Sequence, residues 1–405
     1  MKVAIVGGGA SGLIASIVAK RQGFDVVIIE KQDRIGKKIL ITGNGRCNLT
    51  NLKLSPNNFH TNYKGNHFLP IKIMNLDKTL DFFRELGIIP YVEKNKVFPL
   101  SKQASSVLEV LMLEINRLNI AILLNSKVIN LKKKDSHFEI DLIKENKKEK
   151  LIIDKIIVAT GGQAGVIPDL TIYNILKSLG HNMLSLKPSL VQLLSSSNYC
   201  KIIKGIRVDC EVSIYRNNIC EKKEVGEVLF TEDGLSGPAI FQVSRIASIC
   251  KENNESCYVK LDLHSELNKE QLTKIIYERI EKNPTNTLEQ LFIGWINKKI
   301  AVVIIKNSNI GSINRLCNEL EYDEVERLVN SIKCLSFDIV GPRGFKFAQT
   351  TIGGISLDNV NLENMESKLI SGLYIVGEIL DVDGDCGGYN LQWAWSTGYI
   401  AGQLR

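Results

Sequence analysis

The sequence predicts an α/β fold that begins with a βαβ unit. Lys2–Val6 is a short run rich in β-branched residues, typical of a buried parallel strand. A G-x-G-x-x-G loop follows at once, with glycines at 7, 9 and 12. A helix-compatible segment comes next, and a second apolar run, Asp25–Glu30, ends in an acid about 20 residues after the loop. A G-x-G-x-x-G alone is weak evidence and leaves a structural glycine-rich turn as the alternative. Together with the strand, the helix and the acid at these offsets, it predicts a dinucleotide-binding unit.

Each part of this unit has a physical role in binding a dinucleotide. Gly7 permits a tight turn, Gly9 lets the backbone approach a pyrophosphate, and Gly12 lets helix and strand pack closely. The helix expected over residues 13–22 directs N–H groups and a partial positive charge at the phosphates. Glu30 can accept hydrogen bonds from ribose hydroxyls. We therefore expect cofactor contacts from Gly7, Gly9, Ala10, Ser11, Gly12, Glu30 and Lys31.

Residues 36–51 form a second loop, dense in glycine, asparagine and basic side chains. They show no helical or strand periodicity, and residues 43–46 require unusual backbone angles. The asparagines can pin backbone or ligand atoms, and the cations can neutralise a phosphate or a cofactor edge. An ordinary polar surface loop is the alternative. Since the loop directly follows the βαβ unit, we expect it to wrap the ligand through Lys38, Thr42, Gly43, Asn44, Arg46, Cys47 and Asn48.

Two later strands also end in small-residue turns. Residues 120–158 alternate short strands with polar turns, and the last strand runs into Ala159-Thr-Gly-Gly162. Near the C-terminus, a strand over 372–378 is followed by a glycine-rich loop and a helix over 391–403 with a small-residue face. A Gly-Gly turn that opens a helix directs N–H groups at an anion. A plain loop-to-helix junction is the alternative.

The composition argues against several classes of partner. The 51 Lys and Arg against 44 Asp and Glu give a net charge of +7, but the densest basic stretches, 132–134 and 144–150, are interleaved with acids. We expect a solvated hairpin there and no nucleic-acid partner, with an anionic partner as the alternative. The nine scattered cysteines contain no C-x-x-C pair, so a disulfide framework is not expected and a reducing cytoplasm is the default. No apolar run reaches the roughly 20 residues of a membrane span, and no metal-ligand spacing is present.

Six segments in order resemble the bacterial NAD(P)/FAD-dependent oxidoreductases, flavoproteins with the two-dinucleotide-binding-domain architecture. This family includes aminoacetone-oxidase-like and 3-dehydro-bile-acid delta(4,6)-reductase-like enzymes. The segments are VAIVGGGASGLIAS, GKKILITGNGRCNLTN, KVFPLSKQASSVLEVL, GEVLFTEDGLSGPAIFQVSR, TIGGISL and MESKLISGLYIVGEILDVDGDCGGYNLQWAWSTGYIAG. They extend over nearly the whole chain.

The resemblance implies a Rossmann-like FAD-binding domain of glutathione-reductase type, with an inserted β-barrel and a helical subdomain. The FAD domain would combine residues 1–190 and 345–405, the barrel 191–265 and 331–344, and the helices 266–330. Residues 163–173 lack the glycines and the acid–glycine pair usual in the family, so no FAD contact is assigned to them. The resemblance implies further FAD contacts from Val128, Thr160, Gly161, Gly354, Gly377, Glu378, Asp385, Gly388, Tyr389, Asn390 and Leu391.

Two glycine segments have alternative interpretations. Residues 234–240, with Gly237 before Pro238, favour a strand-to-helix cap over a part of the active-site wall. Residues 350–354 are either a tight bend or a close backbone approach to the flavin, and the resemblance favours the approach. Cys47 and Cys386 each lie on a loop expected near the flavin; small packed thiols are favoured over a dithiol relay, because the C-x4-C of disulfide reductases is absent.

The expected activity is that of an FAD-dependent oxidoreductase relaying hydride through flavin N5. No second G-x-G-x-x-G unit is visible, so electrons must come from NAD(P)H visiting the substrate cavity, from another protein, or from the substrate. Reduction of an activated C=C in an unsaturated 3-oxo compound, bile-acid or steroid-like, is favoured. An amine oxidase of aminoacetone type that produces hydrogen peroxide and an RNA-associated flavoprotein are the alternatives. Candidate proton donors are Arg46 and Tyr389, and less directly Thr350 and Thr351.

Overall fold

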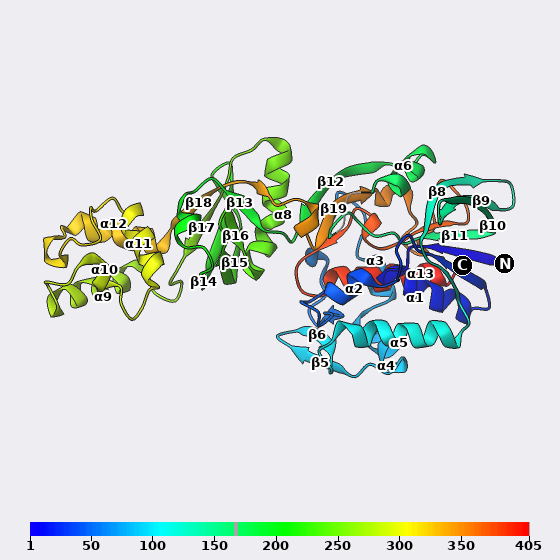
Figure 1. Ribbon diagram of the computed structural model, residues 1–405, viewed down its shortest axis with the longest axis horizontal. Coiled ribbons are helices and arrows are strands. Elements are labelled where there is room, and N and C mark those ends of the chain that lie inside the picture. The colour runs from blue at the N-terminus through cyan, green and yellow to red at the C-terminus, as the bar shows by residue number, and fades with distance from the viewer. Residues whose placement is uncertain (166–168, 405) are drawn as a thin grey trace. The chain divides into compact units, whose positions relative to one another are not determined.

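The computed structural model describes residues 1–165 and 169–404 of the chain (Figure 1). The chain divides into two compact units, one made of Met1–Pro188 with Gln349–Arg405 and the other of Ser189–Ala348. The first contains a parallel sheet covered by helices, and the second contains a closed barrel and a set of helices. The predicted fold class is therefore confirmed.

A five-stranded parallel sheet forms the centre of the first unit. Its side chains are buried on both faces, including all of Val3–Val6, which explains why the strands read as continuous apolar runs. Because the strands are parallel, their carboxyl ends lie at one edge, and the loops that follow them meet there. In order across the sheet, the strands are β20 (Leu373–Ile375), β11 (Lys155–Val158), β1 (Lys2–Val6), β2 (Asp25–Ile29) and β7 (Ala121–Leu123).

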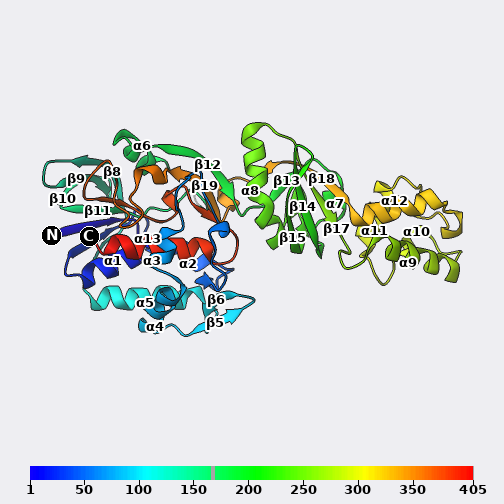
Figure 2. The ribbon, with the colours of Figure 1, turned by 180° about the vertical axis from the view of Figure 1, so that it is seen from behind.

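Helices α1 (Ala10–Arg21) and α13 (Tyr389–Gly402) lie side by side, although they come from opposite ends of the chain (Figure 2). The small-residue face predicted on the C-terminal helix forms this contact. A Cβ built on Gly398 would lie 2.3 Å from the carbonyl oxygen of Ser11, and one on Gly402 would lie 2.7 Å from the Cβ of Val18. Larger residues at these two positions would force the helices apart.

The basic segment of residues 126–153 forms the predicted hairpins. Strands β8 (Ser126–Lys133), β9 (Phe138–Lys144) and β10 (Lys147–Ile153) make an antiparallel sheet. Phe138, Ile140 and Leu142 alternate into the core, whereas Glu139 pairs with Lys150 at 3.1 Å on the exposed face. This alternation is that of a half-buried sheet with a solvated charged side.

The loop predicted over residues 36–51 differs from expectation, because it contains a one-turn helix, α2 (Lys37–Ile41). Gly36 precedes this helix with a φ of +71°, and Ile39 is the helix residue that is buried. The remaining elements of this unit are β3 (Thr50–Asn51), β4 (Phe59–His60), α3 (Leu69–Ile73), α4 (Leu76–Glu85), β5 (Pro90–Glu93), β6 (Lys96–Pro99), α5 (Ala104–Arg117), α6 (Thr171–Ser178), β12 (Met183–Ser189), β19 (Thr350–Ile355) and β21 (Asp383–Gly384).

Residues 350–354 belong to strand β19, which pairs with β12 and is buried throughout, so they form a strand rather than a tight bend. Their close approach to the flavin stays a prediction. Gly353 and Gly354 have φ angles of +82° and +132°. A Cβ on Gly353 would lie 2.1 Å from the carbonyl oxygen of Ser185, and one on Gly354 would lie 2.4 Å from that of Ile379. Both glycines are thus required by contacts with the protein's own backbone.

The second unit is built on a closed six-stranded barrel. In order around it, the strands are β13 (Leu193–Ser195), β16 (Gly234–Ser236), β15 (Ile219–Phe230), β14 (Arg207–Arg216), β17 (Cys257–Asp262) and β18 (Leu335–Pro342). Gly237, with a φ of +108°, then caps helix α8 (Pro238–Asn253), with Pro238 in its first turn. A Cβ on Gly237 would lie 2.4 Å from the carbonyl oxygen of Glu227, so the predicted strand-to-helix cap is confirmed.

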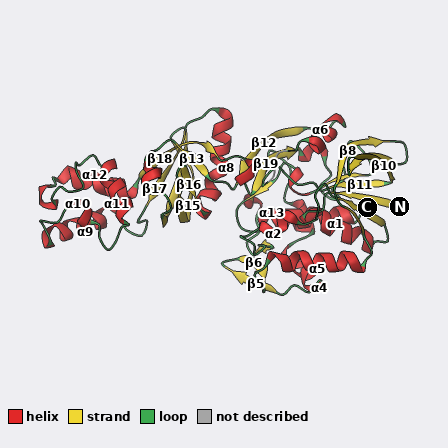
Figure 3. Ribbon diagram, viewed as in Figure 1, coloured by secondary structure: helices red, strands yellow, loops and turns green. Residues whose placement is uncertain are grey.

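The other helices of this unit gather at one end of the barrel (Figure 3). Their buried apolar residues, such as Leu272, Ile304 and Leu328, belong to the same cluster as Val259 and Phe337 of the barrel. The barrel and these helices therefore share one core. The helices are α7 (Tyr199–Ile202), α9 (Lys269–Lys282), α10 (Leu288–Leu291), α11 (Lys298–Asn307) and α12 (Tyr322–Lys333).

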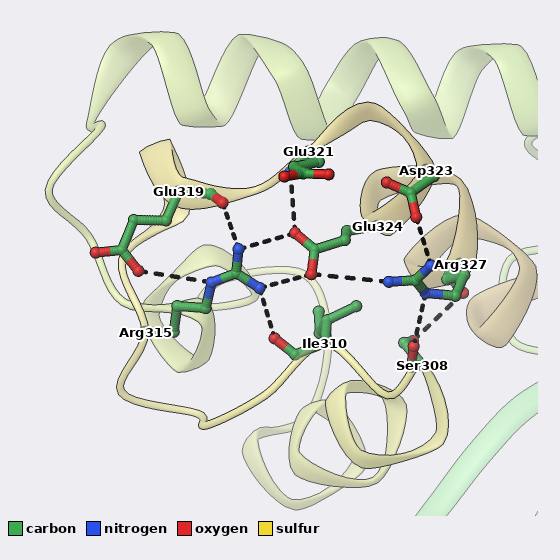
Figure 4. A network of polar contacts seen from close by, with 8 residues as sticks. All are labelled: Ser308, Ile310, Arg315, Glu319, Glu321, Asp323, Glu324 and Arg327. Atoms are coloured by element: carbon green, nitrogen blue, oxygen red, sulfur yellow. Dashed lines mark hydrogen bonds and ion pairs between the residues drawn. The ribbon is translucent and has the colours of Figure 1, made fainter.

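A polar network centred on Glu324 fastens the loop between α11 and α12 (Figure 4). Arg315 donates to both carboxylate oxygens of Glu324, at 2.6 and 2.9 Å, and the backbone N–H of Glu321 donates to one of them at 2.9 Å. Arg315 also donates to the carbonyl oxygen of Ile310 at 2.8 Å. The hydrogen bond from Arg315 lowers the pKa of Glu324. Glu324 is largely buried, so this bidentate pair is shielded from water.

We expect Glu324→Gln to destabilise the protein by about 1–2 kcal/mol, because the half-buried Arg315 guanidinium loses its bidentate carboxylate and keeps only Glu319, at 3.5 Å, as a counter-charge. Asp323→Asn is the matched control: Asp323 is next in sequence and pairs with Arg327, but its side chain is 58% exposed, so a much smaller loss is expected. Urea unfolding of the two variants measures both losses. Equal losses would show that the Glu324 network contributes no more than a surface ion pair.

Candidate cofactor-binding site

The candidate site lies where the carboxyl ends of the central strands meet. An open cleft with about 1170 Å³ of space is bordered by the loops after β1, β2, β11 and β20 and by the first turn of α13. A second recess, with about 580 Å³, is lined by residues of β8 and α6. Gly7, Glu30, Thr160 and Gly161 line both, so the two recesses adjoin.

The glycine loop turns sharply into α1 at one wall of the cleft. Gly7 has a φ of +108°, and a Cβ on it would lie 2.5 Å from the carbonyl oxygen of Ala159. A Cβ on Gly12 would lie 2.0 Å from the carbonyl oxygen of Gly7. Gly9 lines the cleft and has no heavy atom within 4 Å of its Cβ position. No side chain caps α1, so its N-terminal positive dipole end is available to an anion.

Glu30, at the end of β2, is held in a fixed orientation. It is 9% exposed, and its two carboxylate oxygens accept the backbone N–H groups of Gly8 and Gln32, each at 2.8 Å. Each oxygen keeps acceptor capacity for a further donor such as a ribose hydroxyl. Lys31 pairs with Asp169 at 3.0 Å.

Only part of the second loop reaches the cleft. Lys38 and Thr42 line it, and the Lys38 ammonium pairs with Glu378 at 2.6 Å. Arg46, by contrast, pairs with Glu93 at 3.3 Å and stacks over the ring of Phe98 at 4.2 Å. Arg46 therefore contacts the β5–β6 hairpin and does not line the cleft.

Cys47 is fully buried, with a φ of +54°. Burial raises the pKa of its thiol to about 12, so the thiol is protonated at neutral pH. A protonated thiol is a poor nucleophile, which favours the packed-thiol interpretation over a relay with Cys386. All nine cysteines are free. Whether Cys47 and Cys386 form a disulfide on oxidation is tested by air exposure followed by disulfide mapping.

The N-terminus of α13 closes the other end of the cleft. Gly388 precedes it with a φ of +96°, and no side chain caps the helix. A Cβ on Gly388 would lie 2.8 Å from Oδ1 of Asn48, a buried acceptor without a hydrogen-bond partner. Asn390 and Leu391 line the cleft, and Asn390 is fixed by the backbone N–H of Gly384, which donates to its Oδ1 at 2.8 Å. Tyr389 instead points its hydroxyl at the carbonyl oxygen of Lys53, at 3.4 Å.

A family model described as HI0933-like protein Rossmann domain matches residues 1–404. The chain belongs to this family. The predictions of a Rossmann flavoprotein family and of an FAD-dependent oxidoreductase are thereby confirmed.

Three relatives align with the HI0933-like chain over almost their full length. The 3-dehydro-bile acid delta(4,6)-reductase of Clostridium scindens is 34% identical over 99% of this chain and 98% of its own. The ribosomal RNA dihydrouridine synthases of Haemophilus influenzae and Escherichia coli are 28% and 25% identical, each over 98% of this chain and 96% of its own.

The cleft of this HI0933-like protein fits the flavin dinucleotide of its family. Across the described residues, only three buried side-chain atoms have no hydrogen-bond partner: Oδ1 of Asn48, Oε1 of Glu378 and the hydroxyl of Tyr173. Glu378 and Tyr173 line the two recesses, and Asn48 lies against Gly388 at the start of α13. Buried polar atoms are normally satisfied, so their gathering here indicates a polar ligand.

The structure brings most of the predicted cofactor residues of the HI0933-like fold to these linings. Those that line them are Gly7, Gly9, Ala10, Ser11, Glu30, Lys31, Lys38, Thr42, Val128, Thr160, Gly161, Glu378, Asn390 and Leu391. Those outside them are Gly12, Gly43, Asn44, Arg46, Cys47, Asn48, Gly354, Gly377, Asp385, Gly388 and Tyr389. Gly12, Gly377 and Gly388 support the site through close packing, since a Cβ on each would lie within 2.6 Å of another protein atom.

Several lining residues of the HI0933-like fold were missed from the sequence. Gln163, Asp169 and Tyr173 border the smaller recess, in the segment to which no contact was assigned. Residues 166–168 of that segment lie outside the described residues. No periodicity or motif in the sequence indicates that these side chains border the recess. The unpartnered hydroxyl of Tyr173 can be recognised only from the residues that surround it in the fold.

No helix among residues 1–165 and 169–404 is long and apolar enough to cross a membrane. The same residues contain no cluster of three or more histidine, cysteine or acidic side chains that could hold a metal ion.

Proposed function

We propose that this protein reduces a C=C bond conjugated to a carbonyl group, with FAD as cofactor and NAD(P)H as transient hydride donor. The supporting observation is that its full-length relatives are named for one type of reaction on two substrates. A delta(4,6)-reductase of a 3-dehydro acid saturates C=C bonds conjugated to a ketone. A dihydrouridine synthase adds two hydrogens to a ring C=C conjugated to a carbonyl.

The chain's own groups would bind and orient the cofactor for this reaction. FAD, when bound, supplies the hydride carrier. The uncapped start of α1 provides a positive dipole end for a pyrophosphate, and Glu30 provides acceptors for a ribose. Lys31 and Lys38, each paired with a carboxylate, add ammonium donors to the cleft lining. The uncapped start of α13 presents N–H groups and a positive dipole end to the cleft, which favours negative charge on a ligand there.

The first candidate substrate is a small unsaturated 3-oxo compound of bile-acid or steroid type. The relative with this activity is 34% identical over nearly the whole chain. The expected result is that NADH or NADPH bleaches the flavin absorbance anaerobically, and that a conjugated 3-oxo bile acid then restores it. The saturated 3-oxo analogue is the matched control, since it offers a ketone but no C=C.

A second candidate substrate is uridine in ribosomal RNA. Two relatives carry this name, and residues 189–348 contain equal numbers of acidic and basic side chains, so the whole net charge of +7 belongs to the cofactor unit. A positively charged unit suits a polyanionic substrate. In this case ribosomal RNA transcript, rather than the bile acid, would reoxidise the reduced flavin and acquire dihydrouridine detectable by mass spectrometry, with a rate that falls steeply as salt rises.

The opposite direction of electron flow contradicts the proposal. In an amine oxidase of aminoacetone type, aminoacetone would bleach the flavin absorbance in the absence of NAD(P)H. Such an enzyme would release hydrogen peroxide when oxygen is admitted. Anaerobic titration with aminoacetone therefore belongs beside the NAD(P)H titration. Bleaching by the amine together with no reoxidation by either unsaturated acceptor would overturn the reductase assignment.

A further inference from the structure

Tyr173 on α6 is a buried tyrosine whose hydroxyl is unsatisfied. The residue is 1% exposed, and its hydroxyl has no hydrogen-bond partner among the described residues. Burial and the negative charge of Glu378 raise its pKa, so the hydroxyl keeps its proton and can act as a donor. An unsatisfied buried donor destabilises a protein relative to phenylalanine at the same position.

The position of Tyr173 indicates which ligand group it would meet. It lines the smaller recess together with Glu30, Lys31, Val128 and Gly161. Glu30 is the acid at the end of β2 that corresponds to the ribose acceptor of the βαβ unit. The recess is thus the adenosine side of the cleft, and it adjoins the glycine loop through Gly7.

The start of α6 is fastened, so the hydroxyl has a defined position. Asp169 accepts a hydrogen bond from Lys31 at 3.0 Å, one from Lys127 at 3.3 Å and one from the Thr171 hydroxyl at 2.7 Å. The amide side chain of Gln163 accepts from the backbone N–H of Asp169 at 2.6 Å and donates to its carbonyl oxygen at 3.1 Å. These contacts tie the helix to the residue after β2 and to the start of β8, and they preorganise the recess.

We propose that Tyr173 is a cofactor-positioning residue, whose hydroxyl donates a hydrogen bond to an acceptor at the adenosine–pyrophosphate end of FAD. Of the other two unpartnered buried atoms, the one on Glu378 lies in the adjoining cleft and the one on Asn48 lies against Gly388, directly before the α13 turn that borders the cleft. A dinucleotide that extends through both recesses would account for an unpartnered atom in each. The inference rests on FAD binding and is independent of which substrate the enzyme reduces.

The test compares Tyr173→Phe with Tyr374→Phe in apoprotein and holoprotein. Tyr374 is equally buried, but its hydroxyl accepts a hydrogen bond from Lys155 at 3.3 Å. Tyr173→Phe is expected to leave the apoprotein Tm unchanged or raise it, while the Kd for FAD rises about threefold to tenfold. Tyr374→Phe is expected to lower the apoprotein Tm and to leave the Kd unchanged. Differential scanning fluorimetry and titration of flavin fluorescence give the two readouts.

The signs of the two effects decide the matter. A lower apoprotein Tm for Tyr173→Phe would mean that the hydroxyl has a partner within the protein, and an unchanged Kd for FAD would mean that it does not touch the cofactor; either result overturns the proposal. Both measurements are made without substrate. A negative reductase assay would therefore not contradict the role of Tyr173. Equally, a negative result for Tyr173 would not contradict the proposed reductase activity.

Discussion

Replacement of Gly12 by alanine is expected to destabilise the folded cofactor unit strongly. A Cβ at this position would lie 2.0 Å from the carbonyl oxygen of Gly7 and 3.3 Å from the Cβ of Ala159. The first of these is a backbone atom of a turn that cannot rotate aside, so α1 would have to move away from the sheet. We expect a loss of at least about 3 kcal/mol, which corresponds to a fall in Tm of roughly 6–12 °C.

Gly9→Ala is the control that separates folding from cofactor binding. Gly9 has a φ of −88°, which alanine adopts readily, and its Cβ would meet no protein atom within 4 Å. The apoprotein Tm should therefore be unchanged. The new methyl group would lie in the cleft, where the backbone of Gly9 is expected to approach the pyrophosphate. The Kd for FAD should therefore rise at least about tenfold, which corresponds to 1.4 kcal/mol. Unchanged FAD affinity for Gly9→Ala would show that the pyrophosphate does not lie against this loop.

Replacement of Gly388 by alanine is expected to weaken FAD binding more than any other change near α13. Its φ of +96° already disfavours alanine, and the Cβ would lie 2.6 Å from the carbonyl oxygen of Thr50 and 2.8 Å from Oδ1 of Asn48. The start of α13 would be pushed from Asn48, separating the helix N–H groups from that unpartnered acceptor. We expect the Kd for FAD to rise about 100-fold, or 2.7 kcal/mol, measured by fluorescence titration.

Gly87→Ala is the matched control for this change. Gly87 has nearly the same φ, +99°, but no atom lies within 4 Å of its Cβ position, and it follows α4 outside the cleft lining. The substitution should lower the apoprotein stability by about 1–3 kcal/mol through backbone strain alone, with FAD affinity unchanged. If Gly388→Ala and Gly87→Ala behave alike, backbone strain rather than crowding at Asn48 explains the effect.

The predicted cofactor residues that line the cleft are mostly those whose positions depend on neighbours in sequence. The glycine loop, Glu30 and the turn at Thr160 follow directly from the ends of strands, and parallel pairing brings those ends together. The charge and the loop of Arg46 predict a ligand contact, whereas in the structure Arg46 contacts Glu93 and Phe98 of the β5–β6 hairpin and does not line the cleft. Gly354 does not line the cleft, and a Cβ on it would crowd the backbone of Ile379, so its predicted contact with the flavin stays a prediction.

Spacing within short segments was thus sufficient for the nucleotide-binding unit, the class of fold and the glycines that turns require, because strand, turn and helix preferences act over a few residues. Packing was needed to show that α13 lies against α1 and that Lys38 pairs with Glu378. Packing was also needed to find Tyr173. Its hydroxyl is unusual only because it is buried away from water and has no hydrogen-bond partner in the protein. These contacts join residues far apart in the chain, and no local pattern encodes them.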